Sequence, residues 1–187
     1  IDLHAAQIQG FFDIPVDHLA AAPVLASYFR DQKIEDLVVV SPDLGGVTRA
    51  RIMADFLHAP IAIIEKRRPA PGQAEVMNLI GEVDGKTTLL IDDIVDTAGS
   101  LCEGAKALKE RGSKHVLAAC SHAILSEPAV ERLNASPIEQ LVITDSIPLP
   151  VEKQSPKIVT LSLAQSLADV IVRIQSHRSV SLLFNHH

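Results

Sequence analysis

Short apolar runs rich in β-branched residues alternate with helical patterns along most of this chain. Five of the runs are predicted to be buried strands, at residues 37–40, 61–64, 87–91, 115–119 and 140–144. Between them, apolar side chains recur at helical spacing, most clearly over residues 52–57 and 101–108. The alternation of strands with helices predicts an α/β fold with a mostly parallel sheet that is flanked by helices on both faces.

The carboxyl ends of parallel strands are where such sheets bind their ligands, so the residues that follow each strand are the first candidates for a site. The strand at 87–91 is followed directly by Asp92 and Asp93. Neighbouring side chains of an extended segment point in different directions, which predicts different roles for these two carboxylates. Two carboxylates at a sheet edge suit the vicinal hydroxyls of a sugar, either directly or through Mg²⁺, which prefers hard oxygen ligands.

A turn of small residues comes next, made of Asp96, Thr97, Ala98, Gly99 and Ser100. Its backbone N–H groups, its two hydroxyls and the N-terminus of the helix that follows form an anion site by geometry and by dipole. Gly99 lets a phosphate approach the backbone closely, whereas Asp96 is better suited to accept a hydrogen bond from a turn amide or a sugar hydroxyl. A strand end with acidic capping residues is the plain alternative, but the combination favours a site for a phosphorylated sugar.

Composition and charge narrow the function classes. Hydrophobic residues make up 47% of the chain and charged residues 21%, which is typical of a globular protein. The formal net charge is -6 with no long run of like charge, which argues against broad nucleic-acid binding. The apolar runs are strand-sized, so no membrane span is expected, and no signal peptide is expected either. Cys102 and Cys120 lack CxxC or metal spacing, which favours a reducing, cytoplasmic location.

Residues 90–100 resemble the signature that binds 5-phosphoribosyl diphosphate (PRPP) in phosphoribosyltransferases and in PRPP synthetases, the ribose-phosphate diphosphokinases. Other segments resemble synthetase motifs in the same order: residues 2–12, 41–51, 66–69 followed by 75–78, and 179–184. The likeness covers nearly the whole chain and corresponds to the C-terminal part of such an enzyme. It implies the type I phosphoribosyltransferase fold and the formation of PRPP and AMP from ATP and ribose 5-phosphate, with the latter bound by residues 92, 93 and 96–100.

The same resemblance implies that Lys66 and Arg68 are catalytic. It also implies that His4 and Asp43 bind the metal of Mg-ATP, with Mg²⁺ as the cofactor. Transfer of a diphosphoryl group depends on positioning and on cationic stabilisation of the transferring oxygens, which two cations on the polar, Pro-rich connection at 65–74 would supply. Plainer interpretations stay open: a solvated basic loop, a strand-end histidine, and a turn-capping carboxylate at Asp43.

Regulation and assembly follow from the resemblance in the same way. Gln9, Ser179 and Ser181 would form a regulatory phosphate site. Phosphate and ADP would be the effectors, and the intact enzyme would be a homohexamer.

Residues 1–19 are expected to end a largely missing N-terminal lobe, and residues 20–172 to form the phosphoribosyltransferase-type domain. Residues 173–187 are expected to pack on the N-terminal lobe. Two other functions stay open: a phosphoribosyltransferase that consumes PRPP and a base, and a non-catalytic regulatory protein associated with a synthetase. The roles of Arg49 and Arg51 also stay open, between solvating their helix and meeting a phosphate.

Overall fold

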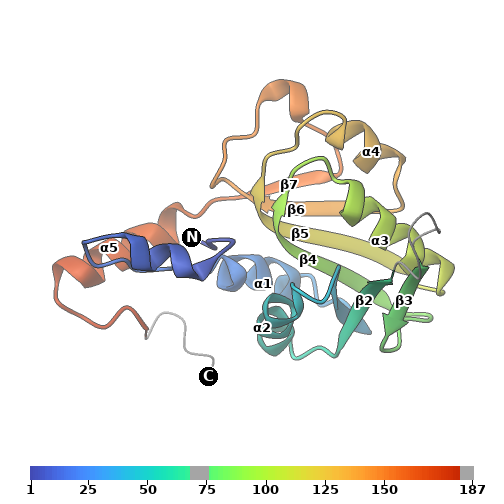
Figure 1. Ribbon diagram of the computed structural model, residues 1–187, viewed down its shortest axis with the longest axis horizontal. Coiled ribbons are helices and arrows are strands. Elements are labelled where there is room, and N and C mark those ends of the chain that lie inside the picture. The colour runs from blue at the N-terminus through green and yellow to red at the C-terminus, as the bar shows by residue number, and fades with distance from the viewer. Residues whose placement is uncertain (68–75, 182–187) are drawn as a thin grey trace.

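The structure is a computed structural model, and it describes residues 1–67 and 76–181 of the chain. At its centre lies a seven-stranded sheet in the order β3-β2-β1-β4-β5-β6-β7 (Figure 1). The described strand pairs are all parallel except β2 with β3, which is antiparallel. The strands are β1 (Leu37–Ser41), β2 (Ile61–Arg67), β3 (Val76–Ile80), β4 (Thr87–Val95), β5 (His115–Ala123), β6 (Gln140–Thr144) and β7 (Ile158–Leu161).

Helices cover both faces of this sheet (Figure 1). The first two pack on one face and the next two on the other: α1 (Ala22–Asp31) and α2 (Val47–Leu57), then α3 (Gly99–Glu110) and α4 (Ala129–Ala135). Because successive strand residues point to opposite faces, Val39 and Leu89 join the core under α1 and α2, whereas Val38 and Leu90 join the core under α3. The predicted mostly parallel sheet with helices on both faces is therefore confirmed.

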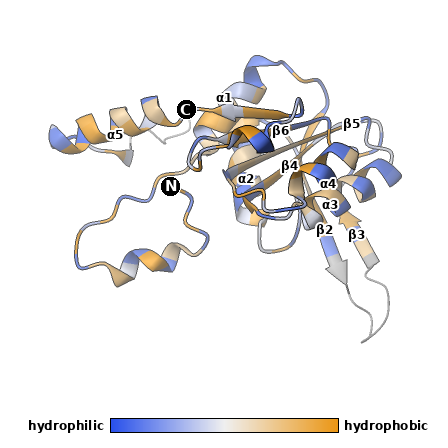
Figure 2. Cartoon of the chain, turned by 90° about the horizontal axis from the view of Figure 1, so that it is seen from above, coloured by the Kyte–Doolittle hydropathy of each residue, from blue (hydrophilic) through white to orange (hydrophobic). Residues whose placement is uncertain are grey.

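Two segments extend away from this layered body on the same side of it (Figures 1 and 2). One is the N-terminal stretch that contains the 3₁₀ helix η1 (Ala6–Phe11). The other is α5 (Ala164–Gln175), which follows β7; the short 3₁₀ helix η2 (Val151–Lys153) precedes that strand. Both segments present apolar side chains to solvent, and their most exposed examples are Phe11 at 87% and Ile171 at 63%. Exposed apolar surface of this kind marks an interaction surface.

The start of α5 is fixed by Asp145, whose Oδ1 accepts a hydrogen bond from the Leu163 amide at 2.8 Å. Hydrogen bonds from Ser162 and from this amide lower the pKa of Asp145 below its ordinary value. The helix continues through the boundary that was expected between residues 172 and 173. In the part of the chain that the structure describes, no helix combines the length and the apolar character needed to cross a membrane.

The five predicted strands are confirmed, but three of them end well beyond their predicted boundaries, and some elements were missed. The strands β4 and β5 run four residues beyond their apolar runs, so Asp92 and Asp93 lie inside β4 and not after it. The strand β2 continues to Arg67, because antiparallel pairing with β3 extends its ladder into the stretch predicted as a loop. Both β3 and β7 lie at sheet edges, where half-exposed strands lack a continuous apolar run, and neither was predicted; nor was α1.

Candidate functional site

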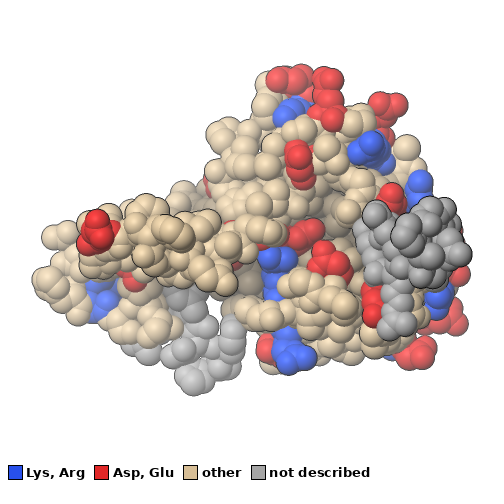
Figure 3. All heavy atoms as spheres, in the orientation of Figure 1, with Lys and Arg blue, Asp and Glu red and all other residues tan. Residues whose placement is uncertain are grey.

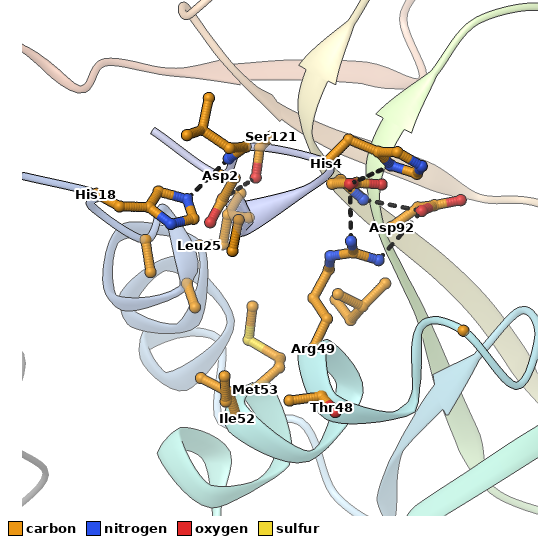
Figure 4. A pocket seen from close by; sticks show the side chains of 17 residues that line it. Asp2, His4, His18, Leu25, Thr48, Arg49, Ile52, Met53, Asp92 and Ser121 are labelled. Atoms are coloured by element: carbon orange, nitrogen blue, oxygen red, sulfur yellow. Dashed lines mark hydrogen bonds and ion pairs between the residues drawn. The ribbon is translucent and has the colours of Figure 1, made fainter. Parts of the chain in front are cut away.

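A cavity of about 320 Å³ lies at the carboxyl end of β4, between the N-terminal segment, α1 and α2 (Figure 4). Leu25 from α1 and Met53 from α2 give it an apolar end. At its polar end, His4 and the end of β4 converge on Arg49. Basic and acidic side chains also adjoin near the middle of the molecular face in Figure 3, and they are otherwise scattered over that face. The cavity therefore joins an apolar surface to a compact charged cluster.

This charged cluster consists of His4, Arg49, Asp92 and Asp93. Nη2 of Arg49 lies 2.7 Å from Oδ2 of Asp93, and its Nη1 lies 3.4 Å from Oδ1 of Asp92. Nδ1 of His4 lies 2.8 Å from the same Asp93 oxygen. The amides of Asp93 and Ile94 donate to the carboxylates of Asp92 and Asp93, each at 2.9 Å. The cluster thus ties the N-terminal segment and α2 to the end of β4.

The surroundings of the two carboxylates in the cluster shift their pKa values in opposite directions. Burial, above all, raises the pKa of Asp92 to about 6, and hydrogen bonding to Asp93 adds to this effect. Burial acts in the same direction on Asp93, but hydrogen bonds from His4 and Asp92 and the charge of Arg49 outweigh it and lower the pKa of Asp93. The side chain of Asp92 is 27% exposed and that of Asp93 only 4%. Different roles for these neighbours stay a prediction, and their surroundings are compatible with it.

His4 is oriented in a way that suits metal binding. Because a carboxylate only accepts hydrogen bonds, the contact with Asp93 favours a proton on Nδ1 and leaves the lone pair of Nε2 for a ligand. The side chain is 75% exposed, so the ring reaches the mouth of the cavity. A carboxylate behind a histidine is also the arrangement that orients metal-bound imidazoles in proteins. The histidine therefore fits its predicted role, and metal binding by His4 stays a prediction.

Asp43 makes the turn-capping contact that was its plainer interpretation. Its Oδ1 accepts the Gly46 amide at 2.8 Å, and its carbonyl accepts the hydroxyl of Ser41 at 2.7 Å, just before α2. Within residues 1–67 and 76–181, no group of three or more His, Cys, Asp or Glu side chains is placed to hold a metal ion. A Mg²⁺ ion that arrives with a nucleotide needs few protein ligands, because phosphates and water complete its shell. A metal role for Asp43 stays a prediction of this kind.

The turn after β4 leads directly into the N-terminus of α3. Ala98 adopts the left-handed conformation with φ 57°, and no side chain caps the helix in the described structure. The first N–H groups of a helix have no partner within it, so this turn keeps donors for an anion. The positive φ falls on Ala98 and not on Gly99. A Cβ added to Gly99 would meet its nearest neighbour, Nη1 of Arg132, at 3.5 Å, so the protein leaves room there.

The hydroxyl and carboxyl side chains of the turn, those of Asp96, Thr97 and Ser100, are exposed and available to a ligand. Arg132 of α4 supports the turn from behind, since its Nη1 donates to the Thr97 carbonyl at 3.1 Å. A groove of about 460 Å³ runs between α3 and α4 beside it and also contains Lys106. Two cations therefore flank the predicted phosphate turn.

Of the two predicted catalytic cations, the structure places the backbone of Lys66 alone, near the β3 edge of the sheet. The backbone of Lys66 belongs to β2 and pairs with that of Met77 in β3. Arg68 lies outside the described residues. Catalytic roles for Lys66 and Arg68 stay predictions from the sequence.

The residues predicted to bind a regulatory phosphate form two separate groups. Gln9 donates from Nε2 to the Ala6 carbonyl at 3.0 Å, within η1. The hydroxyls of Ser179 and Ser181 lie 2.7 Å apart, and Arg173 donates to the carbonyl of Ser179 at 3.0 Å. A hydroxyl pair beside an arginine suits an oxyanion, but no hydrogen bond joins these groups in the described part of the chain. The regulatory site stays a prediction.

Arg49 is the site residue whose role the sequence left open. It occupies the first turn of α2 and pairs with both carboxylates, 43 and 44 positions along the chain, so it does not solvate its helix. Its place is set by β1 and β4 being neighbours in the sheet, which brings the start of α2 beside the end of β4. The available signal was that 41–51 follows a strand end, as residues 92 and 93 do.

The strand order, the crossover helices and the acidic strand end followed by a helix N-terminus define a phosphoribosyltransferase-type fold of type I. A solved adenine phosphoribosyltransferase (APRTase) from Giardia lamblia, in complex with 9-deazaadenine, shares the fold at a TM-score of 0.54 with 15% sequence identity, over 76% of this chain and 77% of that one. The chain belongs to the family described as the phosphoribosyl synthetase-associated domain, whose model matches residues 67–185.

Curated relatives cover almost all of this chain. Proteins named ribose-phosphate pyrophosphokinase from Oceanobacillus iheyensis and Bacillus caldolyticus are each 59% identical to it over 185 residues, which is 99% of this chain. The match spans 58% of the first relative and 59% of the second. A crystal structure of phosphoribosylpyrophosphate synthetase from Mycobacterium smegmatis superposes with a TM-score of 0.86 at 38% identity, over 94% of this chain and 57% of that one. The chain thus spans a little more than half the length of these relatives.

Proposed function

We propose that the protein is a ribose-phosphate diphosphokinase, which makes PRPP and AMP from ATP and ribose 5-phosphate. In this reaction the anomeric hydroxyl of ribose 5-phosphate attacks the β-phosphorus of ATP. The bond between the β-phosphorus and the oxygen that bridges it to the α-phosphate breaks, and AMP leaves. The observation that carries the proposal is the charged cluster of His4, Arg49, Asp92 and Asp93, at the end of a strand whose following turn leads into the uncapped N-terminus of α3.

Ribose 5-phosphate fits the carboxyl end of β4 from two sides. The N-terminus of α3 and the turn at 96–100 would hold its phosphate through backbone N–H groups and hydroxyls. Asp92 is the more exposed carboxylate, so it would accept the sugar hydroxyls, while Asp93 is engaged by His4 and Arg49. We assign the two carboxylates these different roles because Asp93 is buried and already contacts two side chains, which leaves Asp92 to bind the sugar.

Mg-ATP would approach from the side of His4 and Asp43. The donor set, one imidazole nitrogen and one carboxylate, fits a Mg²⁺ ion that keeps the oxygens of nucleotide and water. When bound, the ion would neutralise charge on the phosphates. Lys66 and Arg68 would stabilise the negative charge that develops on the transferring oxygens.

The same proposal includes a larger assembly. The apolar side chains of η1 and α5 would pack on an N-terminal lobe, with residues 1–19 as the end of that lobe and 173–187 against it. The enzyme would be a cytoplasmic homohexamer that phosphate and ADP control through Gln9, Ser179 and Ser181. Support for a regulatory anion comes from the hydroxyl pair beside Arg173.

A second candidate is a non-catalytic protein that regulates a synthetase. The family description, a synthetase-associated domain, favours it. The names of relatives at 59% identity favour the enzyme, and so does the presence of both carboxylates and both predicted catalytic cations. A transferase that consumes PRPP and a base is a third possibility, which the segments around His4 and Lys66 disfavour.

The deciding experiment is phosphorus NMR of the protein with Mg-ATP and ribose 5-phosphate. We expect AMP and PRPP to appear together, and the Asp92→Asn variant to lose this turnover. Asp55→Asn, an exposed carboxylate on α2, is the matched control and should keep it. Turnover of PRPP with a nucleobase would identify the transferase instead.

Calorimetry with ribose 5-phosphate separates the remaining outcomes. Binding without turnover, together with association with an active synthetase, would support the regulatory protein. Absence of both turnover and binding would contradict the placement of the substrate at the end of β4.

A further inference from the structure

Three side chains hold the first residues of the chain against the end of β5. Ser121 donates from Oγ to Oδ2 of Asp2 (Figure 4). His122 places Nε2 at 3.1 Å from the carbonyl oxygens of both Ile1 and Asp2. We call Asp2, Ser121 and His122 the N-terminal latch. None of the three belongs to the charged cluster that carries the proposed function.

Asp2 is held in an unfavourable backbone conformation. Its φ is 39°, in the left-handed region that non-glycine residues rarely adopt. Such conformations persist where the surroundings determine them from several sides. Here the Asp2 amide donates to the Leu19 carbonyl at 2.9 Å, and its carboxylate accepts the Ala21 amide at 3.1 Å as well as the Ser121 hydroxyl. The latch therefore fixes the backbone direction at residue 2.

The ring of His122 is oriented by its own partners. Nε2 faces two carbonyls, which only accept hydrogen bonds, so Nε2 carries a proton. Nδ1 lies 2.9 Å from the hydroxyl of Ser146, and that hydroxyl donates to the Ser121 carbonyl at 2.8 Å. His122 thus belongs to β5, contacts the turn that follows β6, and donates to the N-terminal segment.

The distance between the latch on β5 and the charged cluster on β4 is within the length that the chain covers from Asp2 to His4. The register of β4 and β5 places Asp92 opposite Cys120 and Ile94 opposite His122, so Asp93 and Ser121 are neighbours on the same face. Asp2 contacts Ser121, and His4, two residues later, contacts Asp93. Strands lie about 4.8 Å apart and two extended residues span about 7 Å, so the segment crosses from one strand to the next in this step.

Leu3, between these two contacts, is held as well, because its amide donates to Nε2 of His18 at 2.8 Å. Three consecutive residues of the N-terminal segment are therefore each fixed to a different partner. The side chain of His4 is 75% exposed and is held by its hydrogen bond with Asp93, so its position also depends on what fixes the residues before it.

We propose that the N-terminal latch is a positioning unit for His4. By fixing the backbone at Asp2, it holds the His4 ring against Asp93 with Nδ1 protonated and Nε2 turned toward the nucleotide side. The inference rests on the proposed function for its catalytic consequence, because His4 is there the contact to Mg-ATP. The geometric part, that the latch sets the ring's position and tautomer, stands on the contacts above.

The test is nitrogen-15 NMR of the histidine rings in the intact protein. We expect the wild type to show His4 protonated on Nδ1. In His122→Phe, which removes the donor, and in Asp2→Asn, which leaves β5 unaltered, we expect this signature to shift toward the Nε2–H tautomer that free histidine prefers. His122→Gln keeps a donor near the position of Nε2 and should restore the wild-type signature. His115→Phe, at the opposite end of β5, is the matched control.

A steady-state assay supplies the catalytic readout. His122→Phe should raise KM for Mg-ATP by about 10-fold, the lower end of the effect that loss of a group orienting a metal ligand commonly has, because His122 acts on His4 through the backbone of Asp2. The affinity for ribose 5-phosphate should stay unchanged. A wild-type His4 tautomer in both latch variants would overturn the inference, whatever the activity. A wild-type protein without turnover would contradict the proposed function, and the NMR result would still decide whether the latch positions His4.

Discussion

Nη2 of Arg49 lies 2.7 Å from Oδ2 of Asp93, and this ion pair joins α2 to the end of β4 inside the candidate site. Asp93 is 4% exposed, whereas Arg49 is 29% exposed and reaches Asp92 too. Half-buried arginine is suited to this task, because its planar group binds two acceptors at once. The guanidinium of Arg49 thus offsets the negative charge of two consecutive carboxylates at the end of β4.

Replacing Arg49 by Gln should destabilise the fold, because the buried carboxylate of Asp93 loses its guanidinium partner and keeps the hydrogen bond with the His4 imidazole. The expected loss is about 2 kcal/mol of unfolding free energy at neutral pH, as measured by urea denaturation. Arg51→Gln is the control, since Arg51 is exposed on the same helix and should change stability little. Equal losses in the two variants would mean that the ion pair contributes nothing.

The raised pKa of Asp92 predicts how stability changes with pH. Its folded-state value of about 6 exceeds the reference of 3.8, so the folded state binds the proton more tightly. The contribution of protonated Asp92 to folding stability is fully present below pH 3.8 and is lost as the pH rises through about 6. This contribution is at most about 3 kcal/mol. Asp92→Asn does not titrate, so its stability relative to wild type should grow between pH 4 and 7. A constant difference over that range would contradict the shift.

Asp93 should show the opposite dependence. Its pKa is lowered, so its contribution to stability is present above the unfolded-state pKa and is lost as pH falls through the lower folded-state pKa. Asp93→Asn should therefore be less stable than wild type at pH 7, and the difference should shrink in acid. Urea denaturation across the acid range measures this, and the two asparagine variants serve as controls for each other.

The fold was predictable where burial makes the sequence pattern strong. The strands β1, β4 and β5 have both faces covered, so their apolar runs are continuous. The edge strands β3 and β7 lack that signal, and their pairing depends on tertiary neighbours that periodicity does not report. The extent of β2 was also missed, because Lys66 and Arg67 are charged and join the ladder only through β3.

The site was predictable only in part, for a similar reason. Asp92, Asp93 and the turn at 96–100 are contiguous, so their chemistry is visible in one segment. His4 lies 89 positions from Asp93 in the sequence, and Arg49 lies at least 43 positions from both carboxylates. These residues come together only in the folded sheet. The sequence left two interpretations of Arg49 open, a solvated charge or a phosphate ligand. Neither of them included its ion pairs with Asp92 and Asp93.

Lys66 tests the catalytic chemistry apart from substrate binding. Lys66→Ala should lower kcat by about 100-fold, because one cationic donor to the transferring oxygens is lost. Ribose 5-phosphate affinity should stay the same, because its phosphate is expected at α3. Lys114→Ala, an exposed lysine before β5, is the control. A normal kcat in Lys66→Ala would remove this residue from the mechanism.

A substitution at Gly99 tests ligand binding apart from folding. An added Cβ would lie 3.5 Å from Nη1 of Arg132 and 3.8 Å from Oγ1 of Thr97, so the protein accepts a side chain there. Gly99→Val should therefore fold with near-normal stability but lose ribose 5-phosphate binding, since the valine side chain would crowd the phosphate at the start of α3. Gly10→Ala is the control, because among the described residues no heavy atom beyond Gly10 and its two chain neighbours lies within 4 Å of its added Cβ. Calorimetric affinity equal to that of the wild type would place the phosphate away from this turn.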